Sequence, residues 1–160
     1  MPQTYEPIAT ANGTGASGLI TFTGIPATYT DLVLVFSGAN STSGNNIELQ
    51  FNNDTGANYS LTRLYGSGSG SGASDRTSSL LMTIGNADNQ TVAIANIMNY
   101  TNTTTYKTVL FRLNPTAAYV AAEVGLWRAT PAAINRIDLR NTGGFITAAS
   151  TITLYGIKAA

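Results

Sequence analysis

The chain has 160 residues without cysteine or histidine, and its eight basic and eight acidic residues give a net charge of zero. A single domain of this length buries roughly 70 % of its unfolded surface, so neither a disulfide nor a metal is needed for stability. Because only 10 % of the residues are charged, the composition argues against nucleic-acid binding and against polybasic attachment to a membrane surface. No apolar run reaches the ~20 residues that span a bilayer, and the start of the chain lacks a signal-peptide pattern, so we expect a soluble protein made without export.

The first part of the chain is predicted to form short strands separated by turns. Residues 1–12 are expected to be an N-terminal arm or an edge strand, because Pro2 and Pro7 favour extended backbone and prolines in sheets belong at edges. Residues 13–160 are expected to form one β-sandwich domain. Its first strands are predicted at residues 19–23, 31–36, 47–51 and 59–64, with 31–36 in the middle of a sheet. Within 47–51, apolar residues alternate with Glu48 and Gln50, which predicts a strand with one face in water.

Residues 66–74 are a run of glycine and serine, which predicts a long, flexible surface loop. A phosphate-binding loop is the alternative, but no lysine follows the run and no helix begins there. One further strand is predicted at residues 77–84.

Residues 91–113 are predicted to be the core hairpin around which the fold is organised. The apolar run from Val92 to Met98 is typical of a strand buried on both faces. After an Asn- and Thr-rich connection, Val109, Phe111 and Leu113 fall on one face of a second strand.

Residues 117–128 contain enough alanine and leucine for a short helix, but their alternation favours a strand. Further strands are expected at residues 134–140 and 151–158. In total, roughly nine to eleven short strands with regularly spaced turns predict an all-β protein, a single-domain antiparallel β-sandwich of jelly-roll type.

The residue types argue against common catalytic sites. Without histidine and cysteine the chain lacks the usual general base, the commonest metal ligand and the thiol nucleophile. Glu48 and Glu123 both lie in mid-strand and are the one pair that we consider for glycoside hydrolysis, although exposure or pairing with arginine is the preferred interpretation of each. Asp54 could belong to a calcium loop, but an Asx turn between strands is preferred. We therefore predict no catalytic, metal or cofactor residues.

Several tyrosines are candidates for exposed contacts. Such side chains stack on sugars or anchor protein interfaces, although packing at strand ends explains them equally well. The candidates are Tyr29, Tyr59, Tyr65, Tyr100 and Tyr106.

Five segments together resemble small virion structural proteins of tailed bacteriophages, including those of cyanobacterial phages. They are residues 3–10 (QTYEPIAT), 25–34 (IPATYTDLVL), 58–66 (NYSLTRLYG), 98–108 (MNYTNTTTYKT) and 154–158 (LYGIK). This group contains capsid decoration, or cement, proteins and tail-associated proteins, and it carries no catalytic motif that could be transferred to this chain. The Gly/Ser run is longer and more repetitive than the resemblance implies.

The resemblance implies a protein of the virion that is made in the host cytoplasm. We expect a capsid decoration protein, not an enzyme, that binds the major capsid protein as a homotrimer and stabilises the assembled head. The alternative is a tail-fibre or tail-tip domain that contacts tail proteins and binds host-surface glycan. No binding to nucleic acid or membrane is expected.

Overall fold

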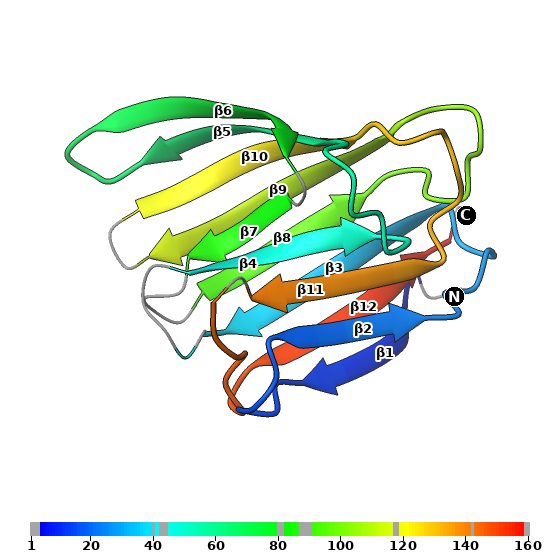
Figure 1. Cartoon of the computed structure of the whole chain (residues 1–160), viewed down its shortest axis with the longest axis horizontal. Coiled ribbons are helices and arrows are strands. Elements are labelled where there is room, and N and C mark those ends of the chain that lie inside the picture. The colour runs from blue at the N-terminus through cyan, green and yellow to red at the C-terminus, as the bar shows by residue number, and fades with distance from the viewer. Residues whose placement is uncertain are drawn as a thin grey trace.

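The computed structural model describes residues 4–39, 41, 45–79, 82–86, 91–116, 119–141 and 143–158. These residues form twelve strands and no helix, and the strands make two antiparallel sheets that pack face to face (Figure 1). The predicted all-β antiparallel sandwich is therefore confirmed.

The two sheets differ in size. The larger sheet has eight strands in the order β1 (Tyr5–Asn12), β12 (Thr151–Ile157), β3 (Asp31–Gly38), β8 (Thr91–Ile97), β9 (Lys107–Thr116), β10 (Tyr119–Trp127), β5 (Tyr59–Gly66) and β6 (Ser71–Ser79). The smaller sheet has four strands in the order β2 (Leu19–Thr23), β11 (Arg136–Asn141), β4 (Asn46–Phe51) and β7 (Met82–Asn86).

The strand order is that of a jelly roll with two insertions. When β5, β6, β9 and β10 are left out, the chain crosses between the four-strand sets β1-β12-β3-β8 and β2-β11-β4-β7 at every step except from β4 to β7, which pair within the smaller sheet. The first strand then lies beside the last and the second beside the second-last, as in a double Greek key. The four inserted strands pair with one another and extend the larger sheet beyond β8.

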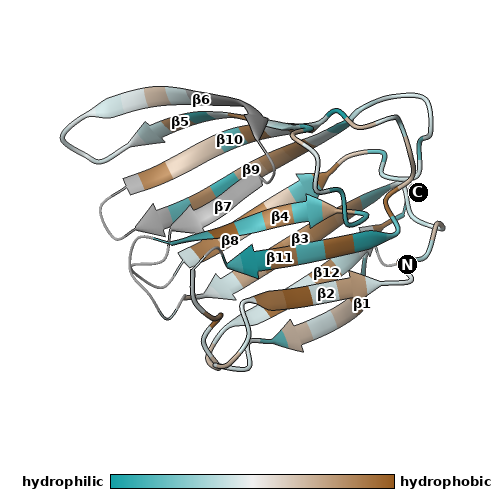
Figure 2. Cartoon of the chain, in the orientation of Figure 1, coloured by the Kyte–Doolittle hydropathy of each residue, from teal (hydrophilic) through white to brown (hydrophobic). Residues whose placement is uncertain are grey.

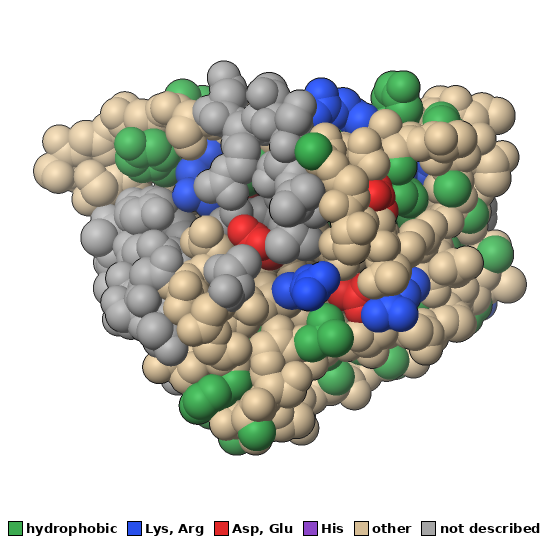
Figure 3. Space-filling model, in the orientation of Figure 1, with side chains coloured by type: hydrophobic (Ala, Val, Ile, Leu, Met, Phe, Trp, Pro, Cys, Tyr) green, Lys and Arg blue, Asp and Glu red, His purple; other side chains and the backbone are tan. Residues whose placement is uncertain are grey.

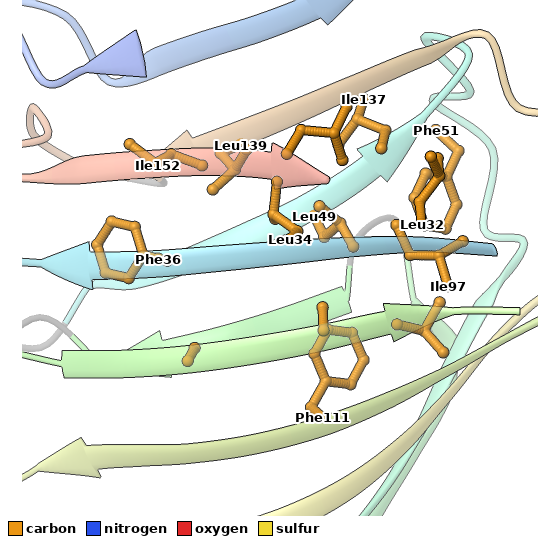
Figure 4. Packing of buried hydrophobic residues seen from close by; sticks show 14 of the residues in the cluster. Leu32, Leu34, Phe36, Leu49, Phe51, Ile97, Phe111, Ile137, Leu139 and Ile152 are labelled. Carbon is orange, nitrogen blue, oxygen red and sulfur yellow. The ribbon is translucent and has the colours of Figure 1, made fainter. Parts of the chain in front are cut away.

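The hydrophobic core lies between the two sheets (Figure 4). Side chains alternate between the faces of a strand, and Figure 2 shows this alternation of apolar and polar residues clearly along β11. Burial of each large apolar side chain contributes about 1.5–3 kcal/mol to folding. The labelled core residues are all buried: Leu32, Leu34, Phe36, Leu49, Phe51, Ile97, Phe111, Ile137, Leu139 and Ile152.

The predicted core hairpin is present as β8 and β9, which pair with each other near the centre of the larger sheet. The inward face of β9 is buried at Val109, Phe111 and Leu113, as predicted. The prediction that β8 is buried on both faces is wrong, because Val92 is exposed and Ile94 is only half-buried. The outer face of the larger sheet has no second layer within the described residues, so an apolar run there need not be buried twice.

The predicted long loop at residues 66–74 is also wrong. Strands β5 and β6 remain paired up to Gly66 and Ser71, so the turn of this hairpin is short. A ladder of backbone hydrogen bonds does not require apolar side chains, so the Gly/Ser segment can pair with β5. The side chain that packs across this ladder comes from β5. Tyr65 lies across Gly72, where an added Cβ would come within 2.5 Å of the tyrosine oxygen. An aromatic ring over a glycine on the neighbouring strand is a known way of pinning strand register.

The single strand predicted at residues 77–84 is divided between the sheets. Its beginning belongs to β6 of the larger sheet and its end to β7 of the smaller sheet, whereas residues 80 and 81 lie outside the described residues. The predicted strand over residues 117–128 is confirmed as β10, although residues 117 and 118 are not among those described.

The N-terminal segment forms an edge strand of the larger sheet. Strand β1 pairs with β12, and its register shifts between Pro7 and Ala9. Proline and a bulge both suit an edge, because neither continues a regular ladder to a further strand. Ile8, Ala9 and Ala11 pack partly buried against the core.

Candidate functional site

The two carboxylates considered for hydrolysis do not share a cleft. Glu123 points into the molecule from β10 and is fully buried, where it forms an ion pair with Arg63 at the opposite position on β5. Glu48 lies in the other sheet, on the face away from the core, opposite Arg140 of β11. Since the two side chains belong to different sheets and face different regions, they do not form the paired arrangement that glycoside hydrolysis needs.

A network of acidic and basic side chains lies on part of the outer face of the smaller sheet (Figure 3). Buried Asp138 accepts hydrogen bonds from Thr21 Oγ1 at 2.6 Å and from Arg136 Nε at 2.8 Å and Nη2 at 2.9 Å. Arg140 Nη1 donates to Gln50 Oε1 at 3.3 Å. Because Glu48 and Gln50 on this face are buried, the prediction that one face of β4 lies in water is wrong.

Arg140 lies opposite Glu48 and donates to Gln50, and both of these β4 residues are buried. Opposite charges in this network are brought together within the chain. The arrangement is consequently structural and offers little to a ligand.

The Asp54 carboxylate is occupied by hydrogen bonds from its own turn and from β10. It accepts hydrogen bonds from the backbone N–H of Gly56 at 2.9 Å, from Asn58 Nδ2 at 3.0 Å and from Trp127 Nε1 at 2.6 Å. Partial burial opposes ionisation, but these donors outweigh it and lower the pKa of Asp54. The bond to Gly56 makes this an Asx turn, as preferred above, and no cluster of three acidic residues within the described ranges could hold a metal ion.

The five candidate tyrosines fall into two groups. Tyr59 and Tyr100 are fully buried, so exposure of these two is a wrong prediction. Tyr59 packs beside Phe51 and Trp127, and Tyr100 donates a hydrogen bond to the Pro26 carbonyl. Tyr29 is half-buried, whereas Tyr65 and Tyr106 are exposed.

The outer face of the larger sheet carries a broad apolar surface. Cross-strand pairing aligns two rows of side chains over β8, β9, β10 and β5. The first row is Asn96, Leu110, Val124 and Thr62, and the second is Ile94, Arg112, Ala122 and Leu64. Leu64, Leu110 and Val124 are exposed by 61, 41 and 48 %. We call these eight residues the outer apolar face.

A groove of about 460 Å³ runs along this face. Thr62, Leu64, Asn96, Leu110, Arg112, Ala122 and Val124 contribute to its lining. Arg112 is exposed, and within the described part of the chain it forms no ion pair. Its cross-strand neighbours are the apolar residues Ile94 and Ala122. The groove therefore combines apolar walls with one exposed cation, Arg112, for which the described residues show no acidic partner, whereas Glu123, which also borders the groove, is buried and paired with Arg63.

A second hollow of about 350 Å³ lies where β8 ends and β9 begins. Its lining residues are Met98, Asn99, Thr105, Tyr106 and Thr108. We call it the Tyr106 hollow. None of these side chains is charged, and the tyrosine ring is exposed by 54 %.

No protein-family model matches the sequence, and no curated protein is significantly similar to it. Among the described residues, no helix is long and apolar enough to cross a membrane.

Sequence reasoning did not identify the outer apolar face. A signal was present, because Leu110, Val120 and Val124 occupy strand positions opposite in phase to the buried Phe111, Ala121 and Trp127. Two apolar faces on neighbouring strands normally indicate two covering layers. Only the strand order shows that one of these faces has no layer over it within the described residues.

Proposed function

We propose that the protein is a capsid decoration protein of a tailed bacteriophage and that it has no catalytic role. It would bind the major capsid protein on the assembled head and stabilise the shell. The observation that carries this proposal is the outer apolar face of the larger sheet. The resemblance of five segments to phage virion proteins supplies the biological setting.

The composition of the face supports a protein partner. The centres of protein interfaces are apolar and depleted in charge, and exposed apolar patches of this kind mark interaction sites. Of the eight residues that define the face, only Arg112 is charged. A surface selected to stay in water would carry more charge, particularly in a chain with no net charge.

Arg112 indicates what the partner presents to the groove. An arginine on an apolar surface gains most from a carboxylate, which its planar guanidinium binds through two parallel hydrogen bonds. We therefore place an apolar segment of the capsid protein, bearing one aspartate or glutamate, in the groove.

The mechanism is mass action. A ligand that binds only the assembled shell lowers the free energy of that state and resists its disassembly. A trimer would deliver three such contacts at once and gain from their effective concentration. This role places the protein in the virion after synthesis in the host cytoplasm, and it requires neither nucleic acid nor membrane.

The test uses heads of the encoding phage that were assembled without this protein. Purified wild-type protein should co-sediment with these heads and raise the temperature at which they open. Leu110→Glu should weaken binding at least tenfold, because it places a charge in the centre of the face. Leu19→Glu is the matched control, since Leu19 is similarly exposed, at 43 %, but lies on the smaller sheet.

Copy number separates this role from its alternative. A decoration protein should be present in hundreds of copies per particle, measured on a mass-calibrated gel of purified virions. A few copies to a few dozen would contradict the proposal and support the second candidate, a tail-fibre or tail-tip domain that binds host-surface glycan. The Tyr106 hollow is the observation that favours this second candidate.

A further inference from the structure

We propose that the Tyr106 hollow binds a neutral saccharide. This site is separate from the groove of the outer apolar face, and its proposed ligand does not depend on capsid binding. A decoration protein with such a site would attach the virion weakly to carbohydrate, whereas a tail protein would use it for host recognition.

The aromatic ring supplies the apolar part of the site. Tyr106 and Met98 are exposed by 54 and 46 %, although both line a hollow. The face of a pyranose ring bears C–H groups that pack against an aromatic ring, and the phenolic oxygen remains available for hydrogen bonding. This combination of an apolar body and a polar tip suits a ligand that has both kinds of surface.

The polar groups of the hollow are available to a ligand. The Asn99 amide, the Thr108 hydroxyl and the Tyr106 hydroxyl make no side-chain hydrogen bond within the described part of the chain. They supply both donors and acceptors, which is what sugar hydroxyls require. Because no charged side chain lines the hollow, a neutral saccharide fits better than a sialylated or phosphorylated one.

Hydrogen bonds beneath the surface of the hollow fix the conformation of the loop that forms it. Asn102 Oδ1 accepts hydrogen bonds from the backbone N–H groups of Thr104 at 2.7 Å and Thr105 at 2.8 Å. Buried Lys107 donates through Nζ to the carbonyls of Asn102 at 2.6 Å and Thr105 at 2.9 Å. Before the loop turns, Tyr100 is buried and its carbonyl accepts a hydrogen bond from the Ile134 N–H.

A loop fixed in this way loses little conformational entropy when a ligand binds. Its rigidity also keeps Tyr106 beside Met98 and Thr108 without a ligand. Burial lowers the pKa of Lys107, yet two carbonyls remain within hydrogen-bond distance of its amine. The buried amine therefore positions the loop and does not itself contact the saccharide.

The experiment screens the purified full chain against an array of neutral hexose and N-acetylhexosamine oligosaccharides, with sialylated oligosaccharides as the charged comparison. Titration calorimetry then measures the affinity of the best neutral ligand. Tyr106→Ala should weaken that affinity about tenfold through loss of the stacking surface, whereas Tyr106→Phe should retain most of it. Asn99→Gly should also weaken binding, because it removes the amide while glycine keeps the positive φ of 47° found at this position.

Tyr5→Ala is the matched control, since Tyr5 is 57 % exposed but lies on β1, and its affinity should equal that of the wild type. Failure of every neutral saccharide to bind, or equal affinity of Tyr106→Ala and wild type, would overturn the proposal. Loss of head binding in Tyr106→Ala without any saccharide binding would instead assign the hollow to the capsid contact. The capsid proposal is judged separately, by Leu110→Glu.

Discussion

The central hairpin contains two apolar residues that the sequence predicts to be buried alike but that differ in burial in the structure. Phe111 points into the core and is buried, whereas Ile94 lies on the outer apolar face and is half-buried. We expect Phe111→Ala to lower the free energy of unfolding by about 3–5 kcal/mol, as for other buried aromatic side chains. Ile94→Ala should cost clearly less, about 1 kcal/mol, because its side chain is partly in water already.

Urea denaturation of both variants and the wild type measures this difference. Equal losses in the two variants would mean that another layer covers Ile94 in solution, such as a second subunit. In that case the loss in Ile94→Ala should depend on protein concentration.

Charged residues are where single-residue prediction was least successful. Lys107, Glu123 and Asp138 are all buried, although their residue types are usually exposed. Glu123 on β10 depends on Arg63, which only the fold brings to it from β5. Lys107 and Asp138 have partners nearby in the sequence, but residue type alone does not reveal those hydrogen bonds. Apolar alternation identified Val109, Phe111 and Leu113 correctly because it requires no knowledge of partners.

The contribution of the end of the β5–β6 hairpin to stability can be tested by replacing its turn. Its turn is closed by a hydrogen bond from the Ser67 N–H to the Gly70 carbonyl, at 2.8 Å, and Gly68 has a φ of +81°. Replacing residues 67–70 by Asn-Gly should leave the melting temperature nearly unchanged, because this pair suits a two-residue hairpin turn. Replacing residues 66–73 should lower it by several degrees, because paired backbone and the contact of Tyr65 with Gly72 would be lost.

Thermal unfolding followed by circular dichroism compares the two replacements. If both leave the melting temperature unchanged, the end of this hairpin contributes nothing to stability, as a flexible loop would. The Gly/Ser composition alone predicts a flexible loop, because it does not reveal that this segment pairs with β5 at Leu64 and Tyr65.

The sequence predicted the positions of strands better than it predicted the sheet to which each strand belongs. The strand at Leu19–Thr23 and the strand character of residues within 117–128 follow from alternation and length. The break between β6 and β7 does not, since a polar segment can pair through its backbone as readily as an apolar one. A continuous prediction over residues 77–84 therefore joined two strands of different sheets.

At the scale of the molecule, two insertions far apart in the sequence build one surface. Strands β5–β6 follow β4, strands β9–β10 follow β8, and the two pairs meet where β10 lies beside β5. The groove takes residues from both insertions, Leu64 from β5 and Leu110 from β9 among them. Periodicity predicts strands but not which insertion pairs with which, so the groove could not be located from the sequence.

The oligomeric state is the last prediction. A chain with no net charge and few charged residues is poorly protected against association, so we expect self-assembly in a defined form. The β1 edge of the larger sheet is interrupted by Pro7 and a register shift, which disfavours open-ended strand addition and suits a closed ring. Light scattering should give a mass of about three times 16.7 kDa. Leu110→Glu should remain a trimer while losing head binding, because we assign the outer apolar face to the capsid protein. A monomeric Leu110→Glu would show instead that this face joins the subunits of the trimer, and a monomeric wild type would remove the trimer altogether.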